Sequence, residues 1–173
     1  MSSRITSQMQ GKGFEFAVAS EMLLQGYNCT PTVVDAGIDI YVVSNSGRQV
    51  KVQVKGRNFR GHGTDVESVN FAKKSYADLG TSPDIIVIVL RNLTNNEHER
   101  PTNSFLIMTK KEFDNLLNEG HVEDLGDKLK LNMWAEFGPD RKASRVVIQD
   151  SYGKKRLGKD LTAYLEAWHL FSI

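Results

Sequence analysis

The apolar run DIIVIVL at residues 84–90 places the strongest limit on what this chain can fold into. Its length suits a strand and is too short for a membrane-spanning helix. Because the run lacks polar alternation, we expect other parts of the protein to cover both of its faces. A helical pattern at residues 69–79 precedes the run and can serve as a crossover, so the strand should lie parallel to a neighbour. The run therefore predicts an α/β fold.

The other elements are expected to surround this strand on a mixed sheet. Apolar spacing predicts a first helix and then three strands, at residues 7–25, 28–34, 37–43 and 49–56. Residues 1–92 would thus form a core with the order helix, three strands, helix, strand (αβββαβ).

A smaller α/β extension at residues 93–173 would pack on this core within the same domain. It contains predicted strands at residues 105–108, 129–137 and 145–150, and a helix opened by a Thr109–Glu112 capping box. A closing helix from Lys159 would turn apolar side chains inward, those of Leu161, Leu165, Trp168 and Phe171.

The composition is that of an ordinary globular protein. The chain has 173 residues and a net charge of +1, which neither demands nor forbids a nucleic-acid partner. The single cysteine, Cys29, excludes an intrachain disulfide and favours a reducing, cytoplasmic setting. No apolar segment approaches the length of a membrane span, and the polar N-terminus lacks a signal-peptide core. We therefore expect a cytoplasmic protein with no membrane partner.

Two strands joined by a short turn carry polar residues on one face. In GIDIYVV at residues 37–43, Asp39 lies on the polar side, and in QVKVQVKG at residues 49–56 that side carries Gln53 and Lys55. A turn centred near Ser46 puts Asp39 across from Gln53, with Lys55 just beyond it. A carboxylate, an amide and an ammonium group would therefore meet on one face.

These three groups suit the hydrolysis of a phosphodiester. A hard cation such as Mg²⁺ prefers oxygen ligands, which the Asp39 carboxylate, the Gln53 amide and the Val54 carbonyl can supply. A bound cation lowers the pKa of a coordinated water and neutralises charge on the phosphate. Lys55 would orient that water and stabilise the developing oxyanion. We therefore predict catalytic roles for Asp39, Gln53 and Lys55.

The stretch from Gly11 to Arg57 resembles the PD-(D/E)XK nuclease superfamily, which includes restriction endonucleases, junction resolvases and some homing endonucleases. The resemblance rests on GKGFEFAVASEML, which contains Glu15, on GIDI and on VQVKG, in that order. It implies a restriction-endonuclease-like fold and cleavage of double-stranded or branched DNA with Mg²⁺, for which Mn²⁺ can substitute. It also implies that Glu15 joins the metal ligands. Because cleavage of both strands needs two sites, we expect a homodimer.

Two positions depart from the pattern of the superfamily. Ile38 stands where a proline is usual, and Gln53 replaces an acidic residue, a Q-x-K form that some members use. The lost charge should weaken metal binding. Two alternatives therefore stay open: a nucleic-acid-binding or regulatory domain of the same fold without catalysis, and an unrelated α/β immunity or adaptor protein. A further alternative is that the polar face is the solvated side of a hairpin and Glu15 a surface residue, but the order of the elements favours the nuclease site.

Basic residues after the hairpin are candidates for contact with a phosphate backbone. The segment RNFRGHG at residues 57–63 has the composition of a loop that could bring Arg57, Arg60 and His62 to DNA. Lys73 could join them from the next helix. The alternative is a charged loop and helix face that only solvent contacts.

Overall fold

The computed structural model describes residues 3–32, 37–43, 47–60, 66–77, 82–93, 100–149 and 157–172. The helices in these ranges are α1 (Ser3–Leu24), α2 (Lys73–Ala77) and α3 (Lys110–Asn118), with the 3₁₀ turns η1 (Thr162–Tyr164) and η2 (Trp168–Phe171). The strands are β1 (Asn28–Pro31), β2 (Ile40–Val43), β3 (Gln49–Arg60), β4 (Val66–Ala72), β5 (Ile85–Leu93), β6 (Thr102–Thr109), β7 (Glu123–Asp124), β8 (Lys128–Phe137), β9 (Ala143–Gln149) and β10 (Leu157–Asp160). No helix within the described ranges is both long and apolar enough to span a bilayer.

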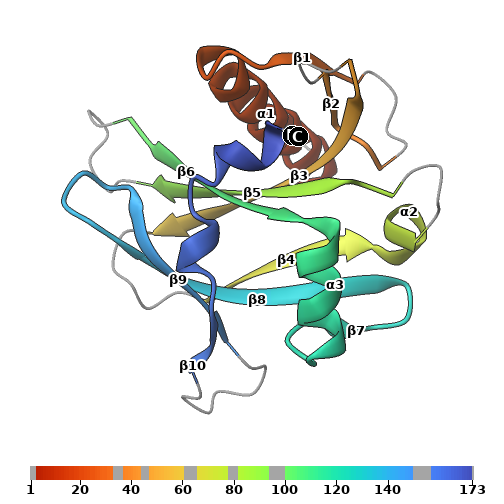
Figure 1. Ribbon diagram of the computed structural model, residues 1–173. Coiled ribbons are helices and arrows are strands. Elements are labelled where there is room, and N and C mark those ends of the chain that lie inside the picture. The colour runs from red at the N-terminus through yellow and green to blue at the C-terminus, as the bar shows by residue number, and fades with distance from the viewer. Residues whose placement is uncertain are drawn as a thin grey trace.

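The first sheet is mixed and contains β5 in its interior. Its strand order is β1-β2-β3-β5-β6, with β5 parallel to β3 and antiparallel to β6. Every residue from Ile85 to Leu90 is buried, because α1 covers one face of this sheet and a second sheet lies against the other (Figure 1). The structure therefore confirms the buried strand, its parallel neighbour and the α/β fold.

The second sheet is antiparallel, with the order β10-β9-β8-β4 and with β7 beside β8. Buried side chains from both sheets and from α3 form one core between them. The predicted capping box opens α3, since the Thr109 side chain accepts from the Glu112 amide and the Glu112 side chain accepts from the Thr109 amide. Strand β4 precedes residue 92 and β8 to β10 follow it, so the predicted core and extension share this sheet.

The helix predicted at residues 69–79 is wrong over its first four residues. Residues Val66–Ala72 form β4, which pairs with β8, and within the described residues the helix of this stretch is Lys73–Ala77. Val69 and Phe71 point inward while Asn70 and Ala72 are exposed, so the period of a strand prevails over the period of a helix. The crossover between β3 and β5 therefore contains a strand and a short helix in place of one long helix.

Two further predictions need correction. Strand β3 extends to Arg60, so residues 57–60 are not a loop, and residues 61–63 lie outside the described ranges. The closing helix predicted from Lys159 is replaced by the end of β10 and the turns η1 and η2. Leu161, Trp168 and Phe171 are nevertheless buried, and Leu165 is partly buried. Apolar spacing thus identified the inward side chains but not the backbone that carries them.

Candidate active site

The hairpin of β2 and β3 has the predicted register. Tyr41 pairs with Lys51, and the apolar side of the hairpin packs into the cluster beneath α1. Asp39 lies one residue before β2, where its amide donates to the carbonyl of Val52 at 2.9 Å. Its Oδ2 accepts a hydrogen bond from the amide of Val54 at 2.6 Å. These bonds to the residues on either side of Gln53 hold Asp39 next to it; the predicted turn at Ser46 lies outside the described residues.

Gln53 brings an amide oxygen into this site. Its side chain is only 2% exposed, and within the described part of the chain its Oε1 has no hydrogen-bond partner. A buried acceptor without a donor costs about 1–3 kcal/mol, so proteins rarely keep one without a reason. A cation held jointly with Asp39 would satisfy this oxygen.

Helix α1 brings Glu15 into the electrostatic reach of the hairpin. The side chain of Glu15 follows the buried ring of Phe14 and is 12% exposed. Burial raises the pKa of Glu15, a hydrogen bond from Lys12 lowers it, and the nearby Asp39 carboxylate raises it again. The ammonium of Lys55 acts on the same carboxyl group in the opposite sense. Glu15 therefore interacts electrostatically with both Asp39 and Lys55, although it lies on a different element.

A glycine on β3 sets how closely α1 approaches the strand. A Cβ placed on Gly56 would lie 2.1 Å from the ring of Phe14, which is far inside van der Waals contact. Only glycine therefore lets this ring pack on the strand. Since Phe14 adjoins Glu15 and Gly56 adjoins Lys55, this one contact positions the backbone at both candidate side chains.

The donor set matches a hard divalent cation. The described residues contain no group of three or more His, Cys, Asp or Glu side chains that could hold a metal ion. The predicted ligand set is not such a group. It combines two carboxylates, of Glu15 and Asp39, with the amide oxygen of Gln53 and the carbonyl of Val54. Such all-oxygen sets are typical of Mg²⁺ and Mn²⁺. The Oε1 of Gln53, which lacks a partner among the residues that the structure describes, is the structural feature that fits such an ion.

Two of the residues predicted to contact DNA, Arg57 and Lys73, have separate partners within the described part of the chain. The Nε of Arg57 donates to the carbonyl of Ser68 on β4, and its Nη1 donates to the carbonyl of Gly56 at 2.9 Å. Lys73 pairs with Asp124, with 2.5 Å between Nζ and Oδ2. The side chain of Arg60 and all of His62 lie outside the described part of the structure. Of these residues, Arg57 is the one that the structure places next to Lys55.

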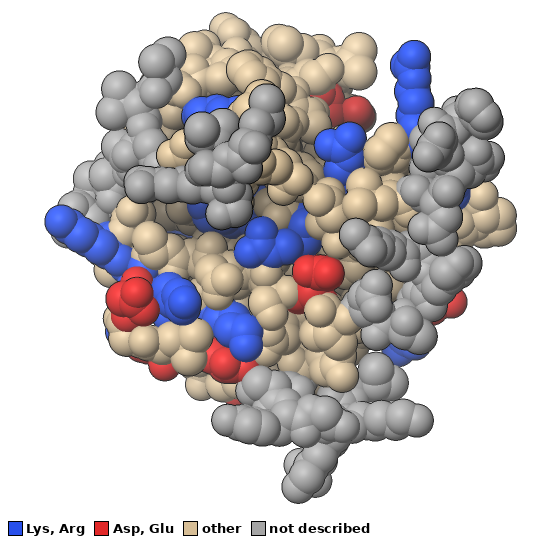
Figure 2. All heavy atoms as spheres, turned by 180° about the vertical axis from the view of Figure 1, so that it is seen from behind, with Lys and Arg blue, Asp and Glu red and all other residues tan. Residues whose placement is uncertain are grey.

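A cleft of about 540 Å³ opens beside Lys55, between α1 and β3. Its lining comprises Ser7, Gln10, Gly11 and Phe14 of α1, Lys55, Gly56, Arg57 and Asn58 of β3, Glu67 of β4 and Leu93 of β5. Seen from behind, the molecule gathers Lys and Arg side chains about the middle of one face, with Asp and Glu between them (Figure 2). The α1 residues of the cleft were not predicted from the sequence, because local spacing does not reveal which strand a helix crosses. The GKG segment at residues 11–13 was the available signal.

Comparison with known proteins relates the chain to an endonuclease by its fold. No protein-family model matches the sequence, and no curated protein matches it either. Among solved structures, the chain is similar to the bacterial homing endonuclease I-Ssp6803I, with a TM-score of 0.52 and 17% sequence identity. The match covers 95% of this chain and 92% of that chain. The protein has an endonuclease-like α/β fold. The likeness includes residues 93–173, for which the sequence resemblance gave little guidance.

Proposed function

We propose that this protein is a metal-dependent endonuclease that hydrolyses DNA phosphodiester bonds through a PD-(D/E)XK-type site of the Q-x-K form. One observation carries the proposal. The Asp39 carboxylate accepts a hydrogen bond from the amide of Val54 and so lies next to the buried Gln53. Lys55 follows Gln53 by two residues on β3, and Glu15 lies within electrostatic reach of both Asp39 and Lys55. The endonuclease-like fold of nearly the whole chain supports the same function.

The residues of the site would divide the chemical work among them. Asp39, the Gln53 amide and the Val54 carbonyl would hold Mg²⁺ or Mn²⁺, and Glu15 would complete the ligands directly or through water. When bound, such an ion lowers the pKa of a coordinated water and neutralises charge on the phosphate. Lys55 would orient the attacking water and stabilise the negative charge that develops on the phosphate oxygens. The hydrogen bond from the Val54 amide would fix the orientation of the Asp39 carboxylate.

The proposed substrate is DNA, either double-stranded or branched. The likeness to a homing endonuclease favours that class over restriction or junction-resolving enzymes. The active form would be a homodimer, in which each copy cuts one strand of a duplex.

A cleavage assay on plasmid, linear and branched DNA, with Mg²⁺ or Mn²⁺, tests this function. We expect the wild type to cut, and Asp39→Asn and Lys55→Ala to lose about 100-fold or more of the rate, as is usual when a charge-stabilising group is removed. Lys51→Ala is the matched control, because Lys51 lies on the same strand and face as Lys55 but two residues before Gln53, on the side away from Lys55.

Each outcome of this assay has a distinct meaning. Equal cleavage by the wild type and both site variants would overturn the proposal. DNA binding that weakens with salt, without any cleavage, would favour the catalytically inactive nucleic-acid-binding domain. Absence of both binding and cleavage would favour an immunity or adaptor protein.

A further inference from the structure

The exposed half of α1 contains two glycines that nothing within the described chain explains. Gly11 and Gly13 both lie inside the helix, where glycine costs about 1 kcal/mol relative to alanine. A Cβ added at either position would meet no atom within 4 Å. Contacts within the folded chain therefore do not require glycine at these two positions.

The two glycines differ in what they face. Gly11 lines the cleft beside Lys55, together with the preceding residue Gln10 and with Ser7 one turn earlier, whereas Gly13 does not line it. A missing side chain at Gly11 widens the cleft, while a missing side chain at Gly13 changes only the open surface. Comparing the two glycines therefore distinguishes an effect on the cleft from an effect on the stability of the helix.

The opposite wall of the cleft suits an anion. Lys55 and Arg57 supply positive charge from β3, and Asn58 supplies an amide, while Glu67 is the acidic residue of the lining. Arg57 is held in place by the carbonyls of Ser68 and Gly56, so its charge is fixed at this wall. The cleft also joins the candidate active site, because Lys55 belongs to both and follows the buried, unpaired oxygen of Gln53 on the same strand.

We propose that the cleft holds the sugar-phosphate backbone of the nucleic acid next to the bond that is cut, and that Gly11 allows this backbone to approach α1 closely. The inference rests on the proposed nuclease function and adds a binding surface to it. Lys55 and Arg57 would face the phosphates from one side, and the polar surface of α1 at Ser7 and Gln10 would border the backbone from the other. The cleft volume lies within the range of about 300–1,000 Å³ that is typical of small-ligand sites and can accommodate a nucleotide-sized group.

The test compares substitutions at the two glycines. Gly11→Leu would fill the cleft, whereas Gly13→Leu adds the same side chain two residues further along the helix, at a position that does not line the cleft. DNA binding is measured by the fluorescence anisotropy of labelled duplex, single-stranded and four-way-junction DNA in EDTA. We expect Gly11→Leu to weaken binding about tenfold, which corresponds to 1.4 kcal/mol, and Gly13→Leu to bind as the wild type does. Gly11→Ala and Gly13→Ala should both raise the thermal unfolding midpoint, which shows that the helix tolerates side chains at both positions.

The readout separates failure of this inference from failure of the proposed function. Equal binding by the two leucine variants would overturn the role of the cleft, even if the wild type cuts DNA. A selective loss of binding in Gly11→Leu, with a wild type that never cuts, would support the cleft and remove the catalytic proposal. A wild type that neither binds nor cuts any of the three DNA forms would overturn both.

Discussion

At the scale of single residues, Gln53 would determine how strongly the proposed site holds a metal ion. In the superfamily pattern that the sequence resembles, this position is usually acidic. Gln53 instead offers an oxygen without a negative charge. That oxygen is buried and lacks a donor within the described residues. The folded protein therefore keeps an unfavourable group at the centre of its candidate site, which is common where stability is exchanged for function.

Gln53→Met is expected to raise the free energy of unfolding in metal-free buffer by on the order of 1 kcal/mol, because it replaces an unpaired buried oxygen with an apolar group of similar shape. The same substitution should abolish both DNA cleavage and the stabilisation of the protein by Mg²⁺. Urea unfolding in EDTA and in Mg²⁺, beside the cleavage assay, measures these effects. A variant less stable than the wild type in EDTA would contradict this expectation and show that the side-chain amide of Gln53 is favourable as it stands.

The sequence predicted some residues of the site for local reasons and others only by resemblance. Asp39, Gln53 and Lys55 follow from strand alternation and a short turn, and the observed register places them as expected. Glu15 lies on a helix, and its approach to the hairpin depends on a contact between distant parts of the chain. The sequence alone therefore suggested Glu15 through its place in a known pattern. Their catalytic roles remain predictions until the cleavage assay is done.

At the scale of elements, the contact of Phe14 with Gly56 controls the position of α1 on β3. No side chain larger than hydrogen fits at residue 56 while the ring is in place. This contact sets the separation between the helix and the strand, and therefore between Glu15 and Lys55, which adjoin Phe14 and Gly56.

Gly56→Ala should lower the free energy of unfolding by about 1–3 kcal/mol, as overpacking of a dense core usually does, and should reduce cleavage by shifting α1. Phe14→Leu in the same chain should recover part of the stability, because the smaller side chain makes room for the added methyl group. A double-mutant cycle from chemical unfolding measures the coupling between the two positions. Additive effects of the two substitutions would contradict a direct contact.

The elements that the sequence misjudged are those whose partners lie far along the chain. VESVNFA alternates inward and outward as β4 because it pairs with β8, whose residues follow about sixty positions later. Its apolar residues can also be placed on a helix face, so local spacing did not distinguish the two. The capping box of α3 and the run of β5 were predicted correctly, since both signals are contained in a few consecutive residues.

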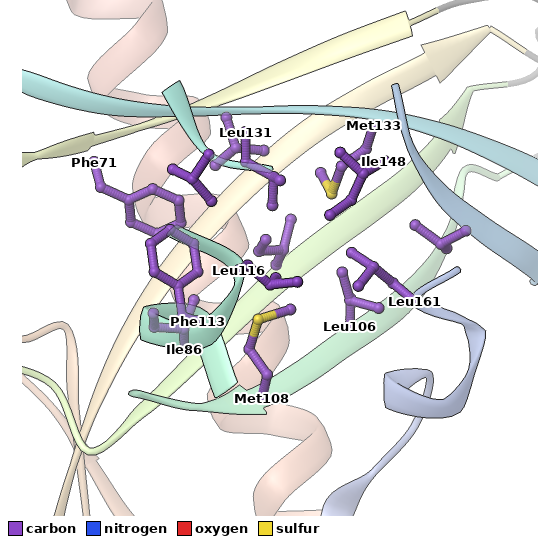
Figure 3. Packing of buried hydrophobic residues seen from close by; sticks show 14 of the residues in the cluster. Phe71, Ile86, Leu106, Met108, Phe113, Leu116, Leu131, Met133, Ile148 and Leu161 are labelled. Carbon is purple, nitrogen blue, oxygen red and sulfur yellow. The ribbon is translucent and has the colours of Figure 1, made fainter. Parts of the chain in front are cut away.

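At the scale of the whole molecule, the two hydrophobic cores support different parts of the fold. One lies between the two sheets, where Phe113 of α3 packs beside Phe71 and Ile86 (Figure 3). The other lies between the first sheet and α1, and it includes Trp168 and Phe171 of η2. The ring centroid of Trp168 is 5.1 Å from that of Phe105, and the Tyr27 hydroxyl donates to the Trp168 carbonyl at 2.8 Å. The second core therefore supports the helix that carries Glu15.

Trp168→Ala is expected to lower the free energy of unfolding by about 3–5 kcal/mol, the usual effect of removing a large buried side chain. Phe113→Ala is the control, because it creates a cavity of similar kind in the core that does not contain α1. Cleavage is measured at a temperature where both variants remain folded by circular dichroism. We expect Trp168→Ala to lose more activity than Phe113→Ala, and equal losses would argue against a special link between η2 and the site.

The place of η2 in the second core has a consequence for the order in which the protein becomes active. A ribosome makes the chain from its N-terminus, so Glu15, Asp39 and Lys55 emerge long before Trp168 and Phe171. A nascent chain would already carry every residue of the site, yet it would lack the packing that completes the layer around α1. Cutting would then begin only after residue 171 has been made. DNA close to the translating ribosome would thus not be cut by the proposed nuclease before residue 171 has been made.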